Sequence, residues 1–140
     1  MIDVKTGHLL IDKEHRITPQ TSLAIIEKWQ LGTAQETRRM GNNWTWVDVK
    51  NLKIDKLYLN ISFLFKNEKI NGFTFVFQDK PYDINPSWAS WNKEVEQTNL
   101  VRFNHWLNEQ FDEVRKLEWG EIEAVYDLKS TGSSIKLTYI

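Results

Sequence analysis

Two carboxylates and a lysine near the middle of the chain have the residue types that Mg²⁺-dependent hydrolysis of a phosphodiester needs. Asp48-Val49-Lys50 lies in a segment expected to be a strand, so Asp48 and Lys50 share a face, and Glu36 precedes them. In such a site the carboxylates hold the metal ion, and the lysine stabilises the charge that develops during the reaction. These three residues make a nuclease-like enzyme one interpretation of the sequence.

Other features argue against catalysis. The PD-(D/E)xK nuclease pattern requires an upstream Pro-Asp pair that this chain lacks, and a D-x-K triplet is common by chance. The sequence has no HExxH, no P-loop, no G-x-S-x-G and no G-x-G-x-x-G after a strand. His105, Glu109 and Asp112 lie at helical spacing, but no second ligand-bearing segment accompanies them, so we expect a solvated helix face and no metal site. We expect neither a cofactor nor catalytic residues.

Charge and tryptophan content favour binding to another protein. The net charge is −1, but residues 1–80 hold 12 Lys/Arg and 9 Asp/Glu, a net of +3, whereas residues 91–128 hold 4 and 9, a net of −5. Regional acidity of this kind can steer a basic partner, and exposed tryptophans can anchor one. The net charge gives no reason to expect nucleic acid or a membrane as the partner. The candidate partner-binding residues are Glu109, Asp112, Glu113, Glu121, Glu123, Trp88 and Trp44.

The elements that must position these residues are indicated by hydrophobic periodicity. Residues 57–65 and 73–77 alternate apolar and polar side chains around a turn at 67–69, which predicts a β-hairpin. Residues 91–116 contain no Gly or Pro and carry an apolar stripe at spacings of three and four, which predicts one long helix. Its stripe consists of Leu100, Phe103, Trp106, Leu107, Phe111 and Val114, with Arg115 and Lys116 placed at its C-terminal end to complement the helix dipole.

Shorter signals complete the expected architecture. A small N-terminal hairpin is predicted at 8–17, a short helix from Leu23 to Trp29, and two strands around a turn at 41–43. A last hairpin is predicted from 119–127 and 135–139, joined by a loop at 129–134. The predicted fold class is α+β, with an antiparallel sheet of about five to seven strands packed by one long helix, together with a short N-terminal helix.

Length and composition describe a single domain over residues 1–140. The chain has 41% hydrophobic residues and 7 Trp, enough large side chains for one core. It contains no cysteine and no apolar N-terminal segment of the kind found in signal peptides. We therefore expect a cytoplasmic protein. Among the tryptophans, Trp106 and Trp119 are expected to be structural, and Trp44 and Trp88 to be partly exposed.

A set of residues in the C-terminal third of the chain resembles the pattern of a protein family. In chain order, the set consists of Trp88 and Trp91, His105-Trp106-Leu107, Trp119-Gly120, Tyr126-Asp127-Leu128-Lys129-Ser130, and Ser133-Ser134-Ile135 up to Tyr139. This set resembles the W-x-x-W, H-x-W-L, W-G and Y-D-x-K-S pattern of a family of small uncharacterised bacterial proteins. In this chain no residue separates His105 from Trp106. The resemblance implies an accessory or immunity-type protein from a toxin locus.

The sequence therefore predicts a non-catalytic protein-binding domain, and most concretely an immunity protein that occludes a basic toxin domain. Two alternatives stay open. One is the Mg²⁺-dependent nuclease-like enzyme that uses Glu36, Asp48 and Lys50. The other is a domain that binds a small ligand in an aromatic-lined, apolar pocket between sheet and helix.

Overall fold

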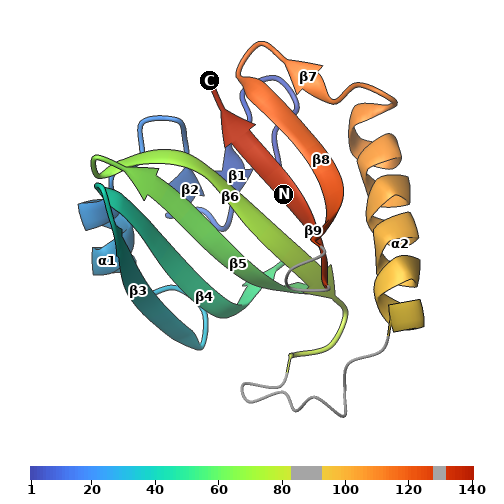
Figure 1. Ribbon diagram of the computed structural model, residues 1–140, viewed down its shortest axis with the longest axis horizontal. Helices are drawn as coiled ribbons and strands as arrows, with labels where there is room; N and C mark the ends of the chain where they lie inside the picture. Colours follow the sequence, from blue (N-terminus) through green and yellow to red (C-terminus); the bar gives the residue numbers. More distant parts are fainter. Residues whose placement is uncertain (83–92, 128–131) are drawn as a thin grey trace.

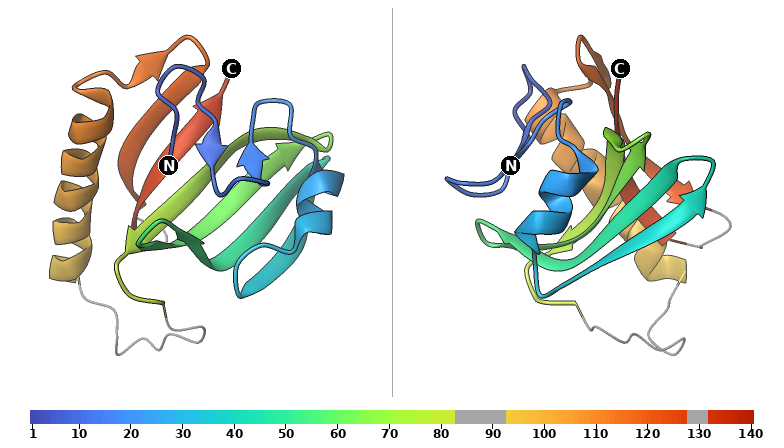
Figure 2. Two further views of the ribbon diagram at one scale, coloured as in Figure 1. Left: turned by 180° about the vertical axis from the view of Figure 1, so that it is seen from behind. Right: turned by 90° about the vertical axis from the view of Figure 1, so that its left-hand side faces the viewer.

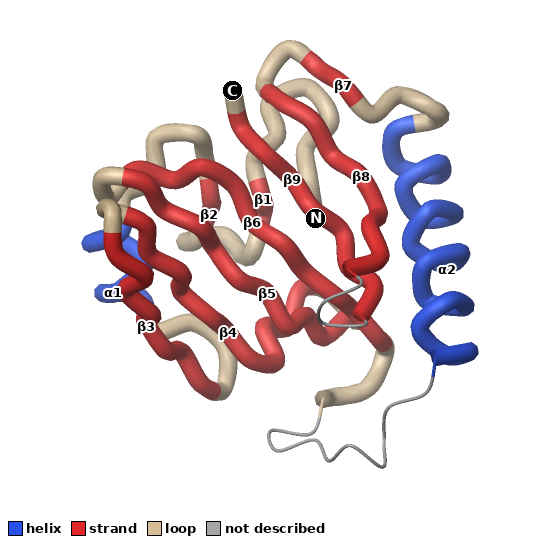
Figure 3. Tube along the Cα trace, viewed as in Figure 1, coloured by secondary structure: helices blue, strands red, loops and turns tan. Residues whose placement is uncertain are grey.

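The computed structural model describes residues 1–82, 93–127 and 132–140. It has an α+β architecture built on one antiparallel sheet of seven strands, in the order β3-β4-β5-β6-β9-β8-β7 (Figure 1). A separate two-stranded sheet, β1-β2, and two helices, α1 and α2, make up the other elements of the described chain (Figure 3). The predicted α+β class with an antiparallel sheet is confirmed.

The bounds of the elements follow the chain in order. They are β1 (Leu9–Leu10), β2 (Arg16–Ile17), α1 (Leu23–Trp29), β3 (Ala34–Gly41), β4 (Trp44–Ile54), β5 (Leu57–Lys66), β6 (Lys69–Gln78), α2 (Lys93–Phe111), β7 (Lys116–Leu117), β8 (Gly120–Asp127) and β9 (Gly132–Tyr139). The predicted N-terminal hairpin and short helix are present. Helix α1 begins where the Ser22 side chain accepts a hydrogen bond from the Ile25 N–H, and it ends at Gln30 in the left-handed conformation.

Strands β3 to β6 form a continuous meander because their turns are made of residues that tolerate positive φ. Asn42 and Asn43 join β3 to β4, and Asn67 and Glu68 join β5 to β6, each residue with φ between 51° and 67°. Consecutive positive φ values produce the tight turn whose twist matches that of the flanking strands. Beyond α2, the β8–β9 hairpin returns to the sheet, and β9 pairs with β6.

One face of this sheet carries the core. Its side chains are the apolar half of each alternating strand, and they are packed by α1, β1-β2 and α2 (Figure 2). The ring centroids of Phe77 and Phe103 lie 5.1 Å apart, and those of Phe75 and Trp106 lie 6.1 Å apart. Arg102 covers both Phe77 and Phe103 and donates a hydrogen bond to the Phe77 carbonyl. The predicted structural role of Trp106 is confirmed.

The N-terminal segment is attached to the same face by two aromatic side chains. The Trp119 Nε1–H donates to the Val4 carbonyl at 2.8 Å, and the Tyr139 hydroxyl donates to the Gly7 carbonyl at 2.7 Å. Gly7 has φ +71°, and a Cβ at this position would overlap the Trp119 ring. Trp119 therefore has the structural role predicted for it, because its side chain contacts residues 4–7 and attaches them to the sheet.

The long helix is shorter than predicted. It ends at Phe111, because Asp112 adopts the left-handed conformation with φ 55°, and the chain turns before β7 begins at Lys116. The last turn of α2 accordingly contains no basic residue, and Val114 is exposed and not part of the core. Arg115 instead donates hydrogen bonds to the Asp112 carbonyl and to Asn108 Oδ1 across the turn. Neither α1 nor α2, as described, is long and apolar enough to cross a membrane.

Candidate functional site

The sheet surface opposite the core, which we call the open face, is covered by none of the described helices (Figures 1 and 2). Its side chains alternate along each strand with the buried apolar ones. The open face comprises Glu36 and Arg38 of β3, Trp44, Trp46, Asp48 and Lys50 of β4, Asn60, Ser62, Leu64 and Lys66 of β5, Thr74 and Val76 of β6, Ser134, Lys136 and Thr138 of β9, and Glu121 and Glu123 of β8.

The dimensions of the open face suit a protein partner. Six of its strands have 8 to 11 residues. With about 4.8 Å between strands and 3.3 Å per residue, these strands present a surface of roughly 24 by 26 Å. That projected area, roughly 600 Å², approaches the ~800 Å² that each partner buries in a standard protein–protein interface.

A network of charged and polar side chains links strands β3, β4 and β5 on this face. The guanidinium of Arg38 forms a two-pronged ion pair with the Asp48 carboxylate, and Ser62 Oγ donates to Asp48 Oδ1 at 2.6 Å. Burial by itself would raise the pKa of Asp48. The hydrogen bonds from Arg38 and Ser62, with the charges of Arg38 and Lys50, outweigh burial and lower that pKa below its ordinary value of 3.8. The Asp48 carboxylate is thus ionised, and both of its oxygens accept hydrogen bonds.

Two half-buried tryptophans lie beside this network. Trp46 lies opposite Arg38, whose Cζ is 5.9 Å from the ring centroid, and Lys66 Nζ lies 5.1 Å from the ring centroid of Trp44. Each indole thus has a cation within about 6 Å of its ring centroid and is partly exposed. The predicted partial exposure of Trp44 is confirmed. Trp88 lies outside the described residues.

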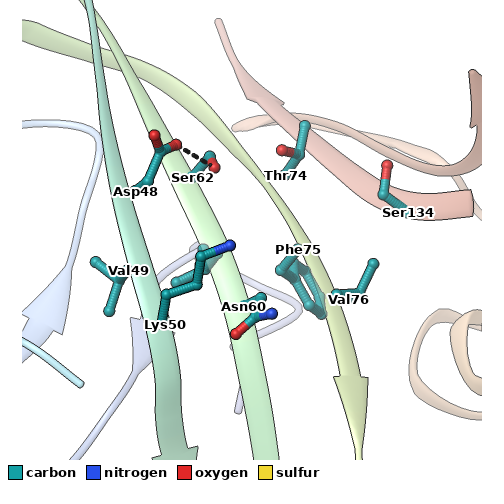
Figure 4. Close-up of a pocket in the computed structure, with 10 residues that line it drawn as sticks. Asp48, Val49, Lys50, Asn60, Ser62, Thr74, Phe75, Val76 and Ser134 are labelled. Atoms are coloured by element: carbon teal, nitrogen blue, oxygen red, sulfur yellow. Dashed lines mark hydrogen bonds between the residues drawn. The ribbon is translucent and has the colours of Figure 1, made fainter. Parts of the chain in front are cut away.

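A shallow hollow of about 100 Å³ occupies the centre of the open face (Figure 4). Polar side chains from four adjacent strands line it: Asp48 and Lys50 of β4, Asn60 and Ser62 of β5, Thr74 of β6 and Ser134 of β9. Lys50 extends across β5, with its amino group between Ser62 and Asn60 (Figure 4). Val49, Ile61, Phe75 and Val76 complete the lining, so the hollow is of mixed polarity and differs from the aromatic-lined pocket that one alternative requires. Between sheet and helix, the rings of Phe75 and Phe77 contact those of Trp106 and Phe103.

The predicted acidic residues are divided between two surfaces. Glu121 and Glu123 project from the open face, because Ile122 between them is buried on the core side. Glu109, Asp112 and Glu113 belong to the end of α2 and the turn after it, and α2 packs against the core side of β8 and β9. The two groups therefore do not form one patch. Glu123 lies opposite Lys136 and Glu121 opposite Lys116, so the strand carboxylates have basic neighbours.

The structure brings the residues of the nuclease alternative together but in an unsuitable arrangement. Glu36 lies directly opposite Asp48, and Lys50 shares their face. A metal ion at Asp48 would have to displace Arg38 from the carboxylate. No cluster of three or more His, Cys, Asp or Glu side chains within the described ranges could hold a metal ion, and His105 is paired with Glu109 at 2.9 Å.

Several residues of this face were not identified from the sequence. Arg38, Ser62 and Asn60 become neighbours of Asp48 and Lys50 only through strand register, whereas Trp46 lies two residues before Asp48 on the same strand. The alternation of residues 44–50 and 57–66 was a usable signal, because it places each of the β4 and β5 members on the polar side of its strand.

No protein-family model matches the chain, and comparisons with curated proteins and with solved structures found no match.

Proposed function

We propose that this protein is a non-catalytic protein-binding domain and that the open face is its binding surface. The observation that carries the proposal is a sheet face close to interface size on which two half-buried tryptophans, Trp44 and Trp46, lie at alternate positions of β4 with a cation near each ring. Trp is among the residues that contribute most to interface energy, and its rigid ring loses little freedom on binding.

Both ends of the open face carry charged side chains, and the β8 carboxylates have Lys116 and Lys136 opposite them. Arg38 and Lys66 flank the tryptophans on β3 and β5, whereas Glu121 and Glu123 lie on β8, four strands from β4. A partner that places a basic segment over β8 and an apolar segment over Trp46 would be complementary in charge and in polarity. The carboxylates would mainly speed association, and the tryptophans would supply most of the affinity.

Within this class, we propose an immunity protein that acts in the cytoplasm and occludes a basic toxin domain. The C-terminal residues that resemble the immunity-type family and the exposed carboxylates of Glu121 and Glu123 on the open face support this narrower proposal. The absence of cysteine agrees with a reducing compartment. In this proposal Glu121 and Glu123, not the carboxylates of α2, contact the toxin.

The experiment that tests the proposal is capture of partners by the tagged protein from its native host, at low and moderate salt, followed by mass spectrometry. Affinity for the captured partner is then measured with Trp46→Ala and with Ile25→Ala, which truncates an exposed side chain of α1 on the core side of the sheet. We expect Trp46→Ala to weaken binding by roughly 2 kcal/mol or more. Ile25→Ala should leave affinity unchanged. Equal affinities for both variants would exclude the open face as the binding surface.

A further inference from the structure

The central hollow of the open face contains hydrogen-bond donors that the fold does not use. The ammonium of Lys50 forms no ion pair and donates no hydrogen bond within the described chain, and it lies over β5 (Figure 4). The hydroxyls of Thr74 and Ser134, which also line the hollow, have no partner in that part of the chain either. Polar groups without a side-chain partner thus line the hollow on four neighbouring strands.

The amide of Asn60 adds a further donor. Its Oδ1 accepts a hydrogen bond from the Asn51 N–H at 3.0 Å, which orients the amide and leaves both Nδ2 hydrogens available. On the opposite wall, Asp48 and Ser62 are already bonded to each other, and the Asp48 charge is compensated by Arg38. The free groups of the hollow are therefore one ammonium, one amide nitrogen and two hydroxyls.

We propose that this hollow binds a phosphate group, either free or as a phosphomonoester of a small molecule. An ammonium together with neutral donors matches an oxyanion, because each N–H or O–H can be aimed at an anionic oxygen. A phosphate offers more acceptor oxygens than a carboxylate and so can accept hydrogen bonds from more donors at once. A cation is disfavoured, because Lys50 would repel it and Asp48 already has Arg38 as its partner.

The size of the hollow agrees with a ligand of this class. Its volume of about 100 Å³ corresponds to roughly three water molecules at about 30 Å³ each, enough for a phosphate group but not for a large organic molecule. The site is open to solvent, so any organic part of a phosphomonoester would extend away from the sheet. The hollow lies within the proposed protein-binding surface, but a small phosphate needs neither tryptophan, so the two proposals can be tested independently.

Binding is tested with the full chain by NMR titration with inorganic phosphate, methyl phosphate and acetate at constant ionic strength. We expect inorganic or methyl phosphate to shift the amide signals of β4, β5 and β6 around the hollow, with a Kd of about 1 to 10 mM for so shallow a site. Tighter binding of methyl phosphate would identify a phosphomonoester as the ligand. Equal or tighter binding of inorganic phosphate would identify the free anion.

Two variants and one control locate the site. Lys50→Met removes the ammonium, and Asn60→Asp keeps the acceptor for Asn51 while it replaces the amide donor by a negative charge. Each should weaken phosphate binding at least about tenfold. Lys28→Met makes the same change of charge on α1, on the other side of the sheet, and should bind phosphate as the original chain does.

Three results would overturn the proposal. They are the absence of shifts with either phosphate, unchanged phosphate binding by Lys50→Met, and acetate binding as tight as that of phosphate. Thermal unfolding of each variant shows that a loss of binding is not a loss of fold. Phosphate titration of Trp46→Ala separates the two proposals, because Trp46 does not line the hollow: retained phosphate binding in a variant with weakened partner binding shows that the phosphate site does not depend on the protein-binding function.

Discussion

Asp48 shows how a carboxylate on a sheet surface can have a structural role. Its two oxygens receive hydrogen bonds from Arg38 on one neighbouring strand and from Ser62 on the other, so one side chain links β3, β4 and β5. The side chain is largely buried, which makes an unpaired charge costly and the two donors necessary. The same bonds occupy the carboxylate that a nuclease would need for its metal ion.

The first prediction concerns the effect of Asp48 on the pH dependence of the free energy of unfolding. Because its pKa is lowered in the folded state, its stabilising effect is complete at neutral pH and is lost as the pH falls through that lowered pKa. Asp48→Asn should reduce the free energy of unfolding at pH 7 by roughly 1–3 kcal/mol. The difference from the original chain should narrow below about pH 4.

Urea denaturation at a series of pH values measures this difference. Glu36→Gln removes an exposed carboxylate from the same face and should change stability by less than about 0.5 kcal/mol. A difference between Asp48→Asn and the original chain that is the same at pH 3 as at pH 7 would show that the Asp48 charge does not stabilise the fold.

The second prediction concerns the buried hydroxyl of Tyr139. Tyr139→Phe leaves the Gly7 carbonyl without its donor and should cost about 1 kcal/mol. Burial raises the pKa of Tyr139 above its ordinary value of 10.0, so the folded chain keeps a proton that the unfolded chain loses. Stability of the original chain should therefore fall as the pH rises above 10, and that of Tyr139→Phe should fall less steeply.

Denaturation between pH 7 and 11 tests the second prediction, and hydrogen exchange of residues 1–8 reports whether the N-terminal segment is released. Tyr58→Phe serves as the control, because it removes a hydroxyl from a half-buried tyrosine on β5. Identical alkaline profiles for Tyr139→Phe and the original chain would contradict the prediction.

At the scale of elements, α2 depends on tertiary contacts for its position. Its inner face, with Phe103, Leu107 and Phe111, is buried against the sheet, whereas Val101 on the outer face is 69% exposed. The helix follows a connection outside the described residues and ends at the left-handed Asp112. Packing of its apolar stripe on β6, β8 and β9 is what places it.

The third prediction follows from this packing. Phe103→Ala should reduce the free energy of unfolding by about 3–5 kcal/mol, because it removes a fully buried ring that contacts Phe77. Val101→Ala, two residues earlier, should change it by less than about 0.5 kcal/mol. Urea denaturation compares the two variants. A loss below about 1 kcal/mol for Phe103→Ala would mean that α2 contributes little to the core.

At the scale of the whole molecule, the sheet separates two surfaces of different character. The core side is covered by α1, β1-β2 and α2, and the open face carries the tryptophans, the hollow and the β8 carboxylates. The sheet thus isolates Glu121 and Glu123 from the carboxylates at the end of α2. Charge that is regional along the sequence is therefore distributed over opposite sides of the fold.

The fourth prediction uses this separation. Reversal of charge at Glu121 and Glu123 to Lys should slow association with a basic partner and reduce the salt dependence of that rate. Reversal at Glu109, Asp112 and Glu113 should leave the association rate nearly unchanged at physiological salt, where charges more than about 8 Å away are screened. Surface plasmon resonance of both sets at two salt concentrations makes the comparison. A larger effect from the α2 set would place the partner on α2 and not on the open face.

Much of the secondary structure could be predicted because it depends on local patterns. Alternation over residues 57–65 and 73–77, and the turns at Asn42-Asn43 and Asn67-Glu68, require only near neighbours. The C-terminal end of α2 could not be predicted in this way. The sequence up to residue 116 still favours a helix, and the left-handed conformation of Asp112 with the bonds of Arg115 is set by where the chain must turn.

The sequence by itself determined the α+β class, the pairing of adjacent hairpins and the polar or apolar side of each strand. These depend on the period of side chains along the backbone and on residues that accept positive φ. Only the tertiary structure decided which polar residues became neighbours. Strand register placed Arg38 and Ser62 on Asp48, collected Lys50, Asn60, Thr74 and Ser134 around one hollow, and put the acidic residues on opposite sides of the sheet. Such contacts join strands distant in sequence, and a one-residue change of register would abolish them.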